Sequence, residues 1–311
     1  MSHPRRPDLL PLRAGVSPSC VVLPSRGQAG DSVLDFLARR LSAVSRQEWL
    51  ERMQAGDVVD AQGRPVAPER AFEGGLRLYY YRHLAHEPAP PFSESVLYQD
   101  EHLLVADKPH FMPVTPSGRY LHHTLLVRLK HQLGLPDLSP LHRIDRDTAG
   151  LVLFSVQPHT RGAYQALFRD RRITKHYDAI APWRPDIAFP RDHVSRMEES
   201  PQFFRMHEVP GEPNSHTRIE LCEVAPSRQW ARYRLTPITG KRHQLRVHMA
   251  ALGLPLRNDA FYPEVNDPPE GDYSRPLQLL ARVLAFDDPV TGEPRRFEST
   301  QRLSLAEAFA I

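Results

Sequence analysis

Hydrophobic positions at helical and strand spacing divide the chain into two regions. In the first region, apolar residues over 33–41 recur at helical spacing and predict a short helix. A second predicted helix opens with the capping-box pattern Ser45–Glu48 and stops at Gly56. A strand–turn–strand pattern over 58–66 and a further strand over 76–81 complete a small module.

The segments around this module differ in composition. Residues 1–20 are rich in proline and arginine and lack periodicity, which predicts a disordered basic arm. The module then spans 21–86, and the proline-rich segment 87–92 is predicted to be a linker. A larger domain is expected over 93–311. The arginines expected to be exposed on the module either bind phosphates or form an ordinary solvated helical face.

The larger region alternates short strands with a few helices. Residues 182–216 are rich in loops and proline, and no chemistry is evident there. The predicted elements are a hairpin at 95–98 and 103–106, a helix at 125–133, a buried strand at 151–154, a helix at 164–171, strands at 174–180, 217–224 and 230–236, and a helix at 245–252.

Composition narrows the class of protein. The 311 residues are 41% hydrophobic and 25% charged. No apolar run approaches the roughly 20 residues of a membrane span, and no signal peptide opens the chain. Two distant cysteines make neither a metal pattern nor a disulfide framework. We therefore expect a cytoplasmic protein, and its net charge of +3 is compatible with a nucleic-acid partner.

The densest group of charged residues precedes the predicted buried strand. Asp145 lies between Arg143 and Arg146, and nearby cations favour an ionised carboxylate. Such a carboxylate serves as a nucleophile, a base, or one partner of a structural salt bridge. Asp147 is expected to bond the backbone of a turn, and Gly150 to permit that turn.

A second dense stretch covers residues 237–249. Leu245, Met249 and Leu252 fall on one face of a helix, and Arg242 and Arg246 share another. We expect the first face to pack and the arginines to be presented outward, where they bind a carboxylate or phosphates or are merely solvated.

Together these stretches resemble the motifs of the RluA-type RNA pseudouridine synthases. The ordered matches are His142–Leu151 for the family signature, Leu104–Pro109 for the opening motif, Lys175–Tyr177 for the Lys-x-Tyr strand, and Leu235–His248 for the Pro-x-Thr-Gly motif. The first region is similar to the alpha-L RNA-binding module, with Asp60–Gly63 in place of its usual Val-Asn-Gly hairpin. Other departures are Ile144, Ala149, Asn258 where glycine is usual before Asp259, and Leu280 where histidine is common.

The resemblance implies a fold and an activity. We expect an α+β protein whose catalytic domain is a large mixed, mostly antiparallel sheet with flanking helices, beside a small α+β module. The implied enzyme is an isomerase that detaches uracil from ribose in RNA, rotates it and reattaches it through carbon 5. No cofactor and no metal are expected.

The resemblance also assigns roles to residues. Asp145 is the implied catalyst, either as nucleophile on the anomeric carbon or as the base that generates a glycal. Arg246 is its implied partner, and Tyr177 is expected to stack on the flipped uracil and assist removal of the carbon 5 proton. Arg143 either fills the gap left by the flipped base or contacts a phosphate. The remaining residues expected to bind RNA are Arg146, Lys175, Lys241, Arg242, His243 and Lys108.

Some alternatives stay open at this stage. Lys108 and His142 are either structural or phosphate-facing. The expected partner is RNA, ribosomal RNA ahead of transfer RNA, and the expected state is a monomer. The competing function is a catalytically silent RNA-binding or ribosome-assembly protein on the same fold. A two-carboxylate glycosidase is the weaker enzyme hypothesis, because only one carboxylate belongs to a recognisable motif.

Overall fold

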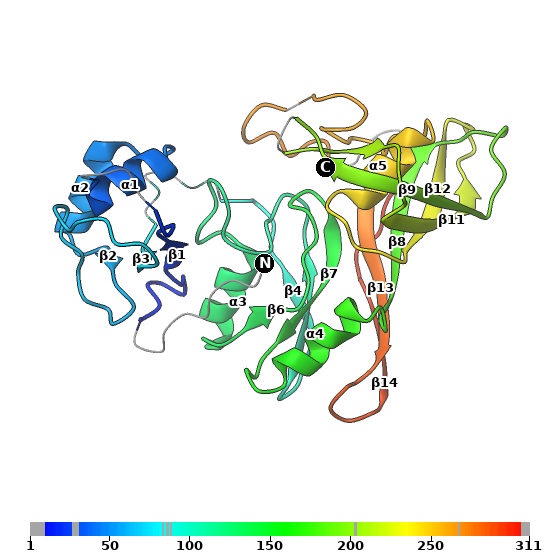
Figure 1. The fold of residues 1–311 in the computed structure, drawn as a ribbon. Helices are drawn as coiled ribbons and strands as arrows, with labels where there is room; N and C mark the ends of the chain where they lie inside the picture. Colours follow the sequence, from blue (N-terminus) through cyan, green and yellow to red (C-terminus); the bar gives the residue numbers. More distant parts are fainter. Residues whose placement is uncertain are drawn as a thin grey trace. The chain divides into compact units, whose positions relative to one another are not determined.

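The computed structural model describes residues 10–26, 31–82, 84, 87, 89–201, 204–266 and 268–305 (Figure 1). The chain divides into two compact units, residues 1–87 and 88–311, so the boundary falls at the start of the predicted linker. Among the described residues, no helix combines the length and apolar character needed to cross a membrane.

The first unit packs two helices on a three-stranded sheet. Both helices begin with complete capping boxes, Ser32 with Asp35 and Ser45 with Glu48, because each serine side chain accepts an amide hydrogen of the first turn. Trp49 is fully buried in the core of this unit. The elements are β1 (Ser19–Val22), α1 (Val33–Arg40), α2 (Arg46–Gln54), β2 (Val58–Val59) and β3 (Arg77–Tyr80), with sheet order β1-β3-β2.

The prediction of a disordered arm over 1–20 is wrong for its second half. Strand β1 pairs antiparallel with β3 from Ser19 onward, and Leu10 is 1% exposed against Val59 and Tyr79. A narrow sheet of three strands needs extra apolar side chains to cover it, and scattered hydrophobic residues in this segment supply them. Residues 1–9 lie outside the described residues.

The Asp60–Gly63 departure still forms a turn. The Asp60 carboxylate accepts hydrogen bonds from the backbone amides of Gln62 and Arg64, at 2.9 and 3.0 Å. Gly63 takes a φ of 77°, which suits glycine. An Asx-type turn therefore replaces the family's usual hairpin residues.

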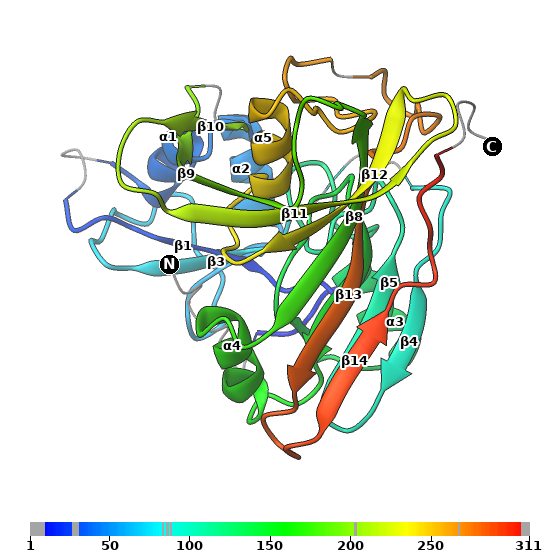
Figure 2. The same cartoon turned by 90° about the vertical axis from the view of Figure 1, so that its right-hand side faces the viewer.

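Among the described residues of the second unit, eleven strands form one mixed sheet, which confirms the expected α+β class. Its strands follow the order β10-β9-β11-β12-β8-β13-β7-β5-β4, with β14 beside β13 and β6 beside β7 (Figures 1 and 2). The strands are β4 (Ser95–Gln99), β5 (Leu103–Lys108), β6 (Ser139–Pro140), β7 (Ala149–Ser155), β8 (Thr174–Pro182), β9 (Arg191–Glu199), β10 (Met206–Val209), β11 (Ser215–Val224), β12 (Trp230–Pro237), β13 (Leu279–Asp287) and β14 (Pro294–Glu298). The helices are α3 (Leu125–Leu133), α4 (Arg161–Arg169) and α5 (Gln244–Ala251).

Strand β7 is buried on both faces, which explains its unbroken apolar sequence. Leu151 and Leu153 pack with residues of α4, whereas Val152 and Phe154 pack with residues of α3. Successive side chains of a strand point to opposite faces, so two helices on opposite faces require apolar residues at every position. Packing on both faces thereby fixes the start of β7, which lies between β13 and β5 in the sheet order, and Asp145 lies in the loop just before it.

Gly150 is needed for close strand contact rather than for a turn. It lies within β7 with φ 108°, and a Cβ there would stand 2.3 Å from the Ala281 carbonyl oxygen. The parallel contact of β7 with β13 therefore depends on the missing side chain. The turn itself spans Asp145–Thr148, closed by the Thr148 amide on the Asp145 carbonyl at 3.2 Å.

The interpretation of 182–216 as loop-rich is also wrong in part. Strands β9 and β10 extend the sheet beyond β11, and Met197 and Met206 pack with Val247 of α5 and Tyr262. Strand β9 is mostly polar because much of it faces solvent, so its sequence lacks the apolar alternation that identifies a strand.

Candidate active site

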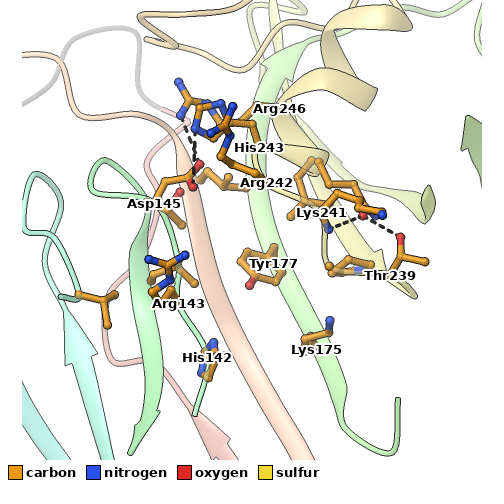
Figure 3. A pocket seen from close by; sticks show the side chains of 18 of the residues that line it. His142, Arg143, Asp145, Lys175, Tyr177, Thr239, Lys241, Arg242, His243 and Arg246 are labelled. Atoms are coloured by element: carbon orange, nitrogen blue, oxygen red, sulfur yellow. Dashed lines mark hydrogen bonds and ion pairs between the residues drawn. The ribbon is translucent and has the colours of Figure 1, made fainter. Parts of the chain in front are cut away.

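An open cleft of about 1280 Å³ lies on the second unit. It is lined by the loop before β7, by β8, and by the loop that joins β12 to α5. Figure 3 shows Asp145, His243 and Arg246 gathered at one end, with Tyr177 and Lys175 of β8 projecting into the cleft. Residues of three of the four motifs thus line one cleft, although they are spread over more than a hundred residues of sequence, whereas the Leu104–Pro109 motif does not line it.

A buried arginine bridges two carboxylates at the floor of this cleft. Arg246 Nη1 donates to Asp145 Oδ2 at 3.2 Å, while its Nε and Nη2 donate to the two oxygens of Asp259 at 2.9 and 2.6 Å. Arg246 is 1% exposed, whereas the Asp145 side chain is 27% exposed toward the cleft. Burial alone would lower the pKa of Arg246, but Asp259 and then Asp145 raise it above its ordinary value.

This geometry corrects the expected orientation of the helix. We expected α5 to present Arg242 and Arg246 together on an outer face, but α5 begins only at Gln244. Arg246 points inward and Arg242 lies in the preceding loop, exposed at the rim of the cleft. A guanidinium with two carboxylates can be buried because its charge is compensated, which spacing along a helix does not reveal.

Buried side chains hold the loop that carries Asp145. Lys108 is fully buried and its Nζ donates to the carbonyls of Pro109 and Arg146, each at 2.9 Å. Its burial lowers the pKa of Lys108 to about 7, while the nearby carboxylates of Asp147 and Asp145 oppose that shift. The His110 Nδ1 hydrogen is donated to the Asp147 carbonyl at 2.7 Å. The backbone carbonyls of Arg146 and Asp147, two successive residues of the loop, are therefore held by buried side chains.

Two sequence expectations change accordingly, and for His142 one of the two alternatives is favoured. Lys108 supports the loop instead of contacting RNA, because none of its surface is accessible. The Asp147 carboxylate accepts a hydrogen bond from Arg146 Nε at 2.8 Å, rather than from the turn backbone as expected. His142 is structural: its Nε2 accepts the Leu153 amide hydrogen at 3.0 Å.

The environment of His142 supports this assignment. Its ring stacks on Phe168 at 4.7 Å between centroids. Burial lowers the pKa of His142 to about 3, so the ring is neutral near pH 7. The histidine links the loop to β7 and to α4.

Strand β8 supplies the opposite wall. Lys175 and Tyr177 both line the cleft, and Ala179 packs beneath α5, so the predicted common face of these three residues is confirmed. Burial raises the pKa of Tyr177 above its ordinary value, and the nearby Asp145 charge adds to the shift. The tyrosine is therefore a neutral hydroxyl on an aromatic ring that faces the cleft.

Cations surround the mouth of the cleft. Arg143, Lys241 and Arg242 are exposed and line it, and Arg146 lines it while half-buried. The structure brings together every residue that we expected to bind RNA except Lys108. It adds Arg119 and Arg171, which also line the cleft and which no motif indicated.

His243 occupies an unusual position between the floor and the rim. It precedes α5 with a positive φ of 54°, and its Nε2 lies 3.9 Å from Asp145 Oδ1. Its Nδ1 is 2.9 Å from the Tyr262 hydroxyl. Burial lowers the pKa of His243 below its ordinary value, and the charge of Asp145 opposes that shift.

The sequence places Asp259 after the Asn258 departure but does not indicate its role. Its side chain is completely buried, and its Oδ1 also accepts the amide hydrogens of Phe261 and Tyr262. The preceding Asn258 has a φ of 63°, a conformation that asparagine tolerates better than most residues. This explains how asparagine stands where the resembled family usually has glycine.

One group of side chains has a spacing compatible with a metal ion. Candidate ligand atoms of His193, Glu208 and His248 lie within 4.8 Å of one another, on β9, β10 and α5. His193 Nε2 is already paired with Glu208 Oε1 at 2.7 Å. None of these three residues lines the cleft.

The hydrogen bonds of His248 argue against an ion there. The Ser215 hydroxyl donates to the Ser195 carbonyl, so it accepts from His248 Nε2 at 2.9 Å. Gln244 donates to the Thr217 hydroxyl, which in turn donates to His248 Nδ1 at 2.9 Å. Both ring nitrogens are used, and no lone pair remains for a metal. The absence of a metal cofactor stays a prediction.

Comparisons with known proteins agree on one family. The model of the family described as RNA pseudouridylate synthase matches residues 102–251. An uncharacterized RNA pseudouridine synthase of Synechocystis is 33% identical over 234 residues, which cover 74% of this chain and 79% of that protein. The dual-specificity RNA pseudouridine synthase RluA of Haemophilus influenzae is 31% identical over 68% of this chain and 94% of its own length.

A solved structure supports the fold. The structure of human RNA pseudouridylate synthase domain containing 1 superposes with a TM-score of 0.56 and 23% identity, and the match covers 70% of this chain and 86% of that one. The mixed sheet is therefore shared with a pseudouridylate synthase domain.

Proposed function

Since the chain belongs to the RNA pseudouridylate synthase family and is an isomerase of uridine in RNA, we propose that Asp145 is its catalytic carboxylate. The supporting observation is the geometry at the floor of the cleft. The buried Arg246 donates a hydrogen bond to Asp145 Oδ2, while the Asp145 side chain remains partly exposed to the cleft. An ionised carboxylate is thus aimed at the space where a nucleotide would bind.

Both chemical pathways begin from this ionised state. As a nucleophile, Asp145 attacks the anomeric carbon and displaces N1 of uracil; as a base, it removes a sugar proton and generates a glycal. In either case the N1–C1′ bond breaks, a C5–C1′ bond forms, the C5 proton leaves and N1 gains a proton. No electrons are exchanged overall, so the isomerisation needs no oxidant.

Tyr177 is suited to hold the detached base. Its ring faces the cleft near Asp145, and stacking of a flipped base on an aromatic ring stabilises the extruded state. Because its raised pKa keeps the hydroxyl protonated, we expect this group to relay the C5 proton rather than to hold it as a base.

The cations around the mouth are suited to the RNA backbone. Arg143, Arg146, Lys175, Lys241 and Arg242 line the cleft where flanking phosphates would approach a flipped uridine. Arg143 fills the gap left by the base or contacts a phosphate, as the sequence suggested. We include the first unit as a second RNA contact, and we expect the protein to act as a cytoplasmic monomer.

We propose ribosomal RNA as the first target and transfer RNA as the second. The relative from Haemophilus influenzae is named a dual-specificity enzyme, so both classes of RNA belong in the same experiment. Pseudouridine should be mapped in total RNA from cells with and without this gene, and from cells that carry only Asp145→Asn. We expect one or a few pseudouridines to disappear in both mutant backgrounds.

The outcomes separate the two functional hypotheses. Sites lost with the gene and restored by the wild type, but not by Asp145→Asn, support the enzyme and name its target. Sites restored equally by the variant would contradict the role of Asp145. If no site changes while the purified protein still binds RNA, the silent RNA-binding function becomes the better explanation.

A further inference from the structure

The imidazole of His243 has a hydrogen-bond environment that determines where its proton lies. The Tyr262 hydroxyl oxygen accepts the backbone amide hydrogen of Met206 at 2.8 Å. Tyr262 is 5% exposed, so its own hydroxyl hydrogen needs an acceptor, and His243 Nδ1 lies 2.9 Å away. A hydroxyl that donates to Nδ1 requires that nitrogen to carry a lone pair, which leaves the proton of the neutral ring on Nε2.

The contact of His243 Nε2 with Asp145 favours the same tautomer. His243 Nε2 faces Asp145 Oδ1 at 3.9 Å, while Asp145 Oδ2 is held by Arg246. An unprotonated Nε2 would direct its lone pair at a carboxylate oxygen, which is repulsive, whereas an Nε2 hydrogen is attracted to it. The separation exceeds a hydrogen bond, so the attraction between this hydrogen and Asp145 is electrostatic in this structure.

We propose that Tyr262 is a positioning residue that fixes His243 as a neutral Nε2–H donor directed at the reactive oxygen of Asp145. Such a donor stabilises the carboxylate without adding a second cation beside Arg246. It also leaves Asp145 ionised, whereas an imidazolium at this distance would compete with the anomeric carbon for the carboxylate. The inference rests on the proposed role of Asp145.

The charges around the ring define the expected pH dependence. Asp145 and Asp259 favour the imidazolium, Arg242 and Arg246 oppose it, and burial is the largest influence, so the pKa of His243 lies below its ordinary value. Protonation of Nδ1 would also remove the lone pair that accepts the Tyr262 hydroxyl hydrogen, so this hydrogen bond would be lost. We therefore expect kcat/KM to fall on the acid side with an apparent pKa below about 6.5.

The first test observes the tautomer directly in the full-length wild type. The protein is labelled with 15N-histidine, and long-range 1H–15N spectra at neutral pH are compared with those of His243→Gln to assign the ring. A protonated Nε2 and an unprotonated Nδ1 are expected. A ring protonated at Nδ1 would overturn the proposal, whatever the activity of the enzyme, so this result is separable from the role of Asp145.

The second test removes only the hydroxyl that fixes the tautomer. Tyr262→Phe should give a mixture of His243 tautomers and shift the acid limb of kcat/KM toward higher pH, with about a tenfold loss at pH 6. Tyr233→Phe is the matched control, because it also loses a buried hydroxyl, which donates to the Pro182 carbonyl, on the far side of α5 from this contact. An acid limb that moves equally in both variants would mean a general loss of stability.

The third test replaces the imidazole of His243 with a hydrogen-bond donor that does not titrate. His243→Gln places a neutral N–H group near Asp145, so it should retain part of the activity and lose the acid limb assigned to His243. His243→Ala should lose activity at all pH values. An unchanged acid limb in His243→Gln would contradict the proposal.

Discussion

The floor and the rim of the cleft carry similar charges that are held in opposite ways. At the floor, Arg246 and Asp259 are buried and joined by two hydrogen bonds, and a third reaches Asp145. At the rim, Arg143 and Lys241 are exposed. Buried pairs are scarcely screened by salt, whereas exposed charges are. The side chains of the floor are therefore held in place before RNA binds, whereas we expect those of the rim to affect mainly the affinity of the protein for RNA.

The largest expected effect comes from the floor. Asp145→Asn keeps the shape of the side chain and an oxygen for Arg246, but removes the carboxylate that reacts. We expect product formation to fall on the order of 10⁴-fold, with RNA affinity unchanged within a few-fold. Single-turnover assays and filter binding measure the two quantities. A variant with turnover near that of the wild type would remove Asp145 from the mechanism.

The support beneath Asp145 should matter nearly as much. Asp259→Asn leaves the buried guanidinium of Arg246 with one carboxylate partner instead of two, so we expect about 3 kcal/mol less stability and roughly a 100-fold lower kcat. Asp288→Asn is the matched control, because the Asp288 side chain is also buried, accepts the Tyr164 hydroxyl hydrogen at 3.0 Å and does not line the cleft. We expect Asp288→Asn to lose a similar amount of folding stability as Asp259→Asn, but to keep its kcat.

Denaturant unfolding and single-turnover rates separate these two effects. If Asp259→Asn and Asp288→Asn lose kcat equally, the buried pair at the floor contributes only to stability. The distinction between floor and rim would then be a matter of folding rather than of catalysis.

Substitutions at the rim should weaken RNA binding more than they slow the reaction. Arg143→Ala and Lys241→Ala are each expected to raise KM several-fold at low salt, with kcat little changed and the slope of log affinity against log salt reduced by about one. Arg169→Ala is the control, since this exposed arginine at the end of α4 pairs with the neighbouring Asp170 and does not line the cleft. A kcat loss in Arg143→Ala that exceeds its effect on KM would place Arg143 with the floor, as expected if it stabilises the flipped state.

The smallest effect on chemistry is expected from the first unit. A chain that begins at Pro88 should keep single-turnover chemistry at saturating RNA, but bind RNA more weakly and with a flatter salt dependence. Its circular dichroism spectrum and unfolding curve check that the second unit remains folded. An unchanged salt slope would mean that the first unit does not bind RNA.

Local patterns were sufficient for most helices and strands. The capping box at Ser45, the period of α3 and the apolar run of β7 each predicted an element that the structure contains. They also placed Lys175 and Tyr177 on one face, because the alternation of a strand is a local property. Strand β9 lacks a recognisable sequence pattern because backbone pairing with β10 and β11 holds it, and of its side chains only Met197 is fully buried.

The motifs identified Asp145, Tyr177 and Arg246, but only the tertiary structure decided how they are held. Spacing along α5 suggested an outward arginine, whereas compensation by Asp145 and Asp259 allows Arg246 to be buried. In the same way, Lys108 has the residue type of a phosphate ligand, and its burial under the Arg146 carbonyl makes it a support of the loop. A side chain's charge is determined by sequence, whereas its partners and its exposure depend on residues distant along the chain, and these decide what that charge can do.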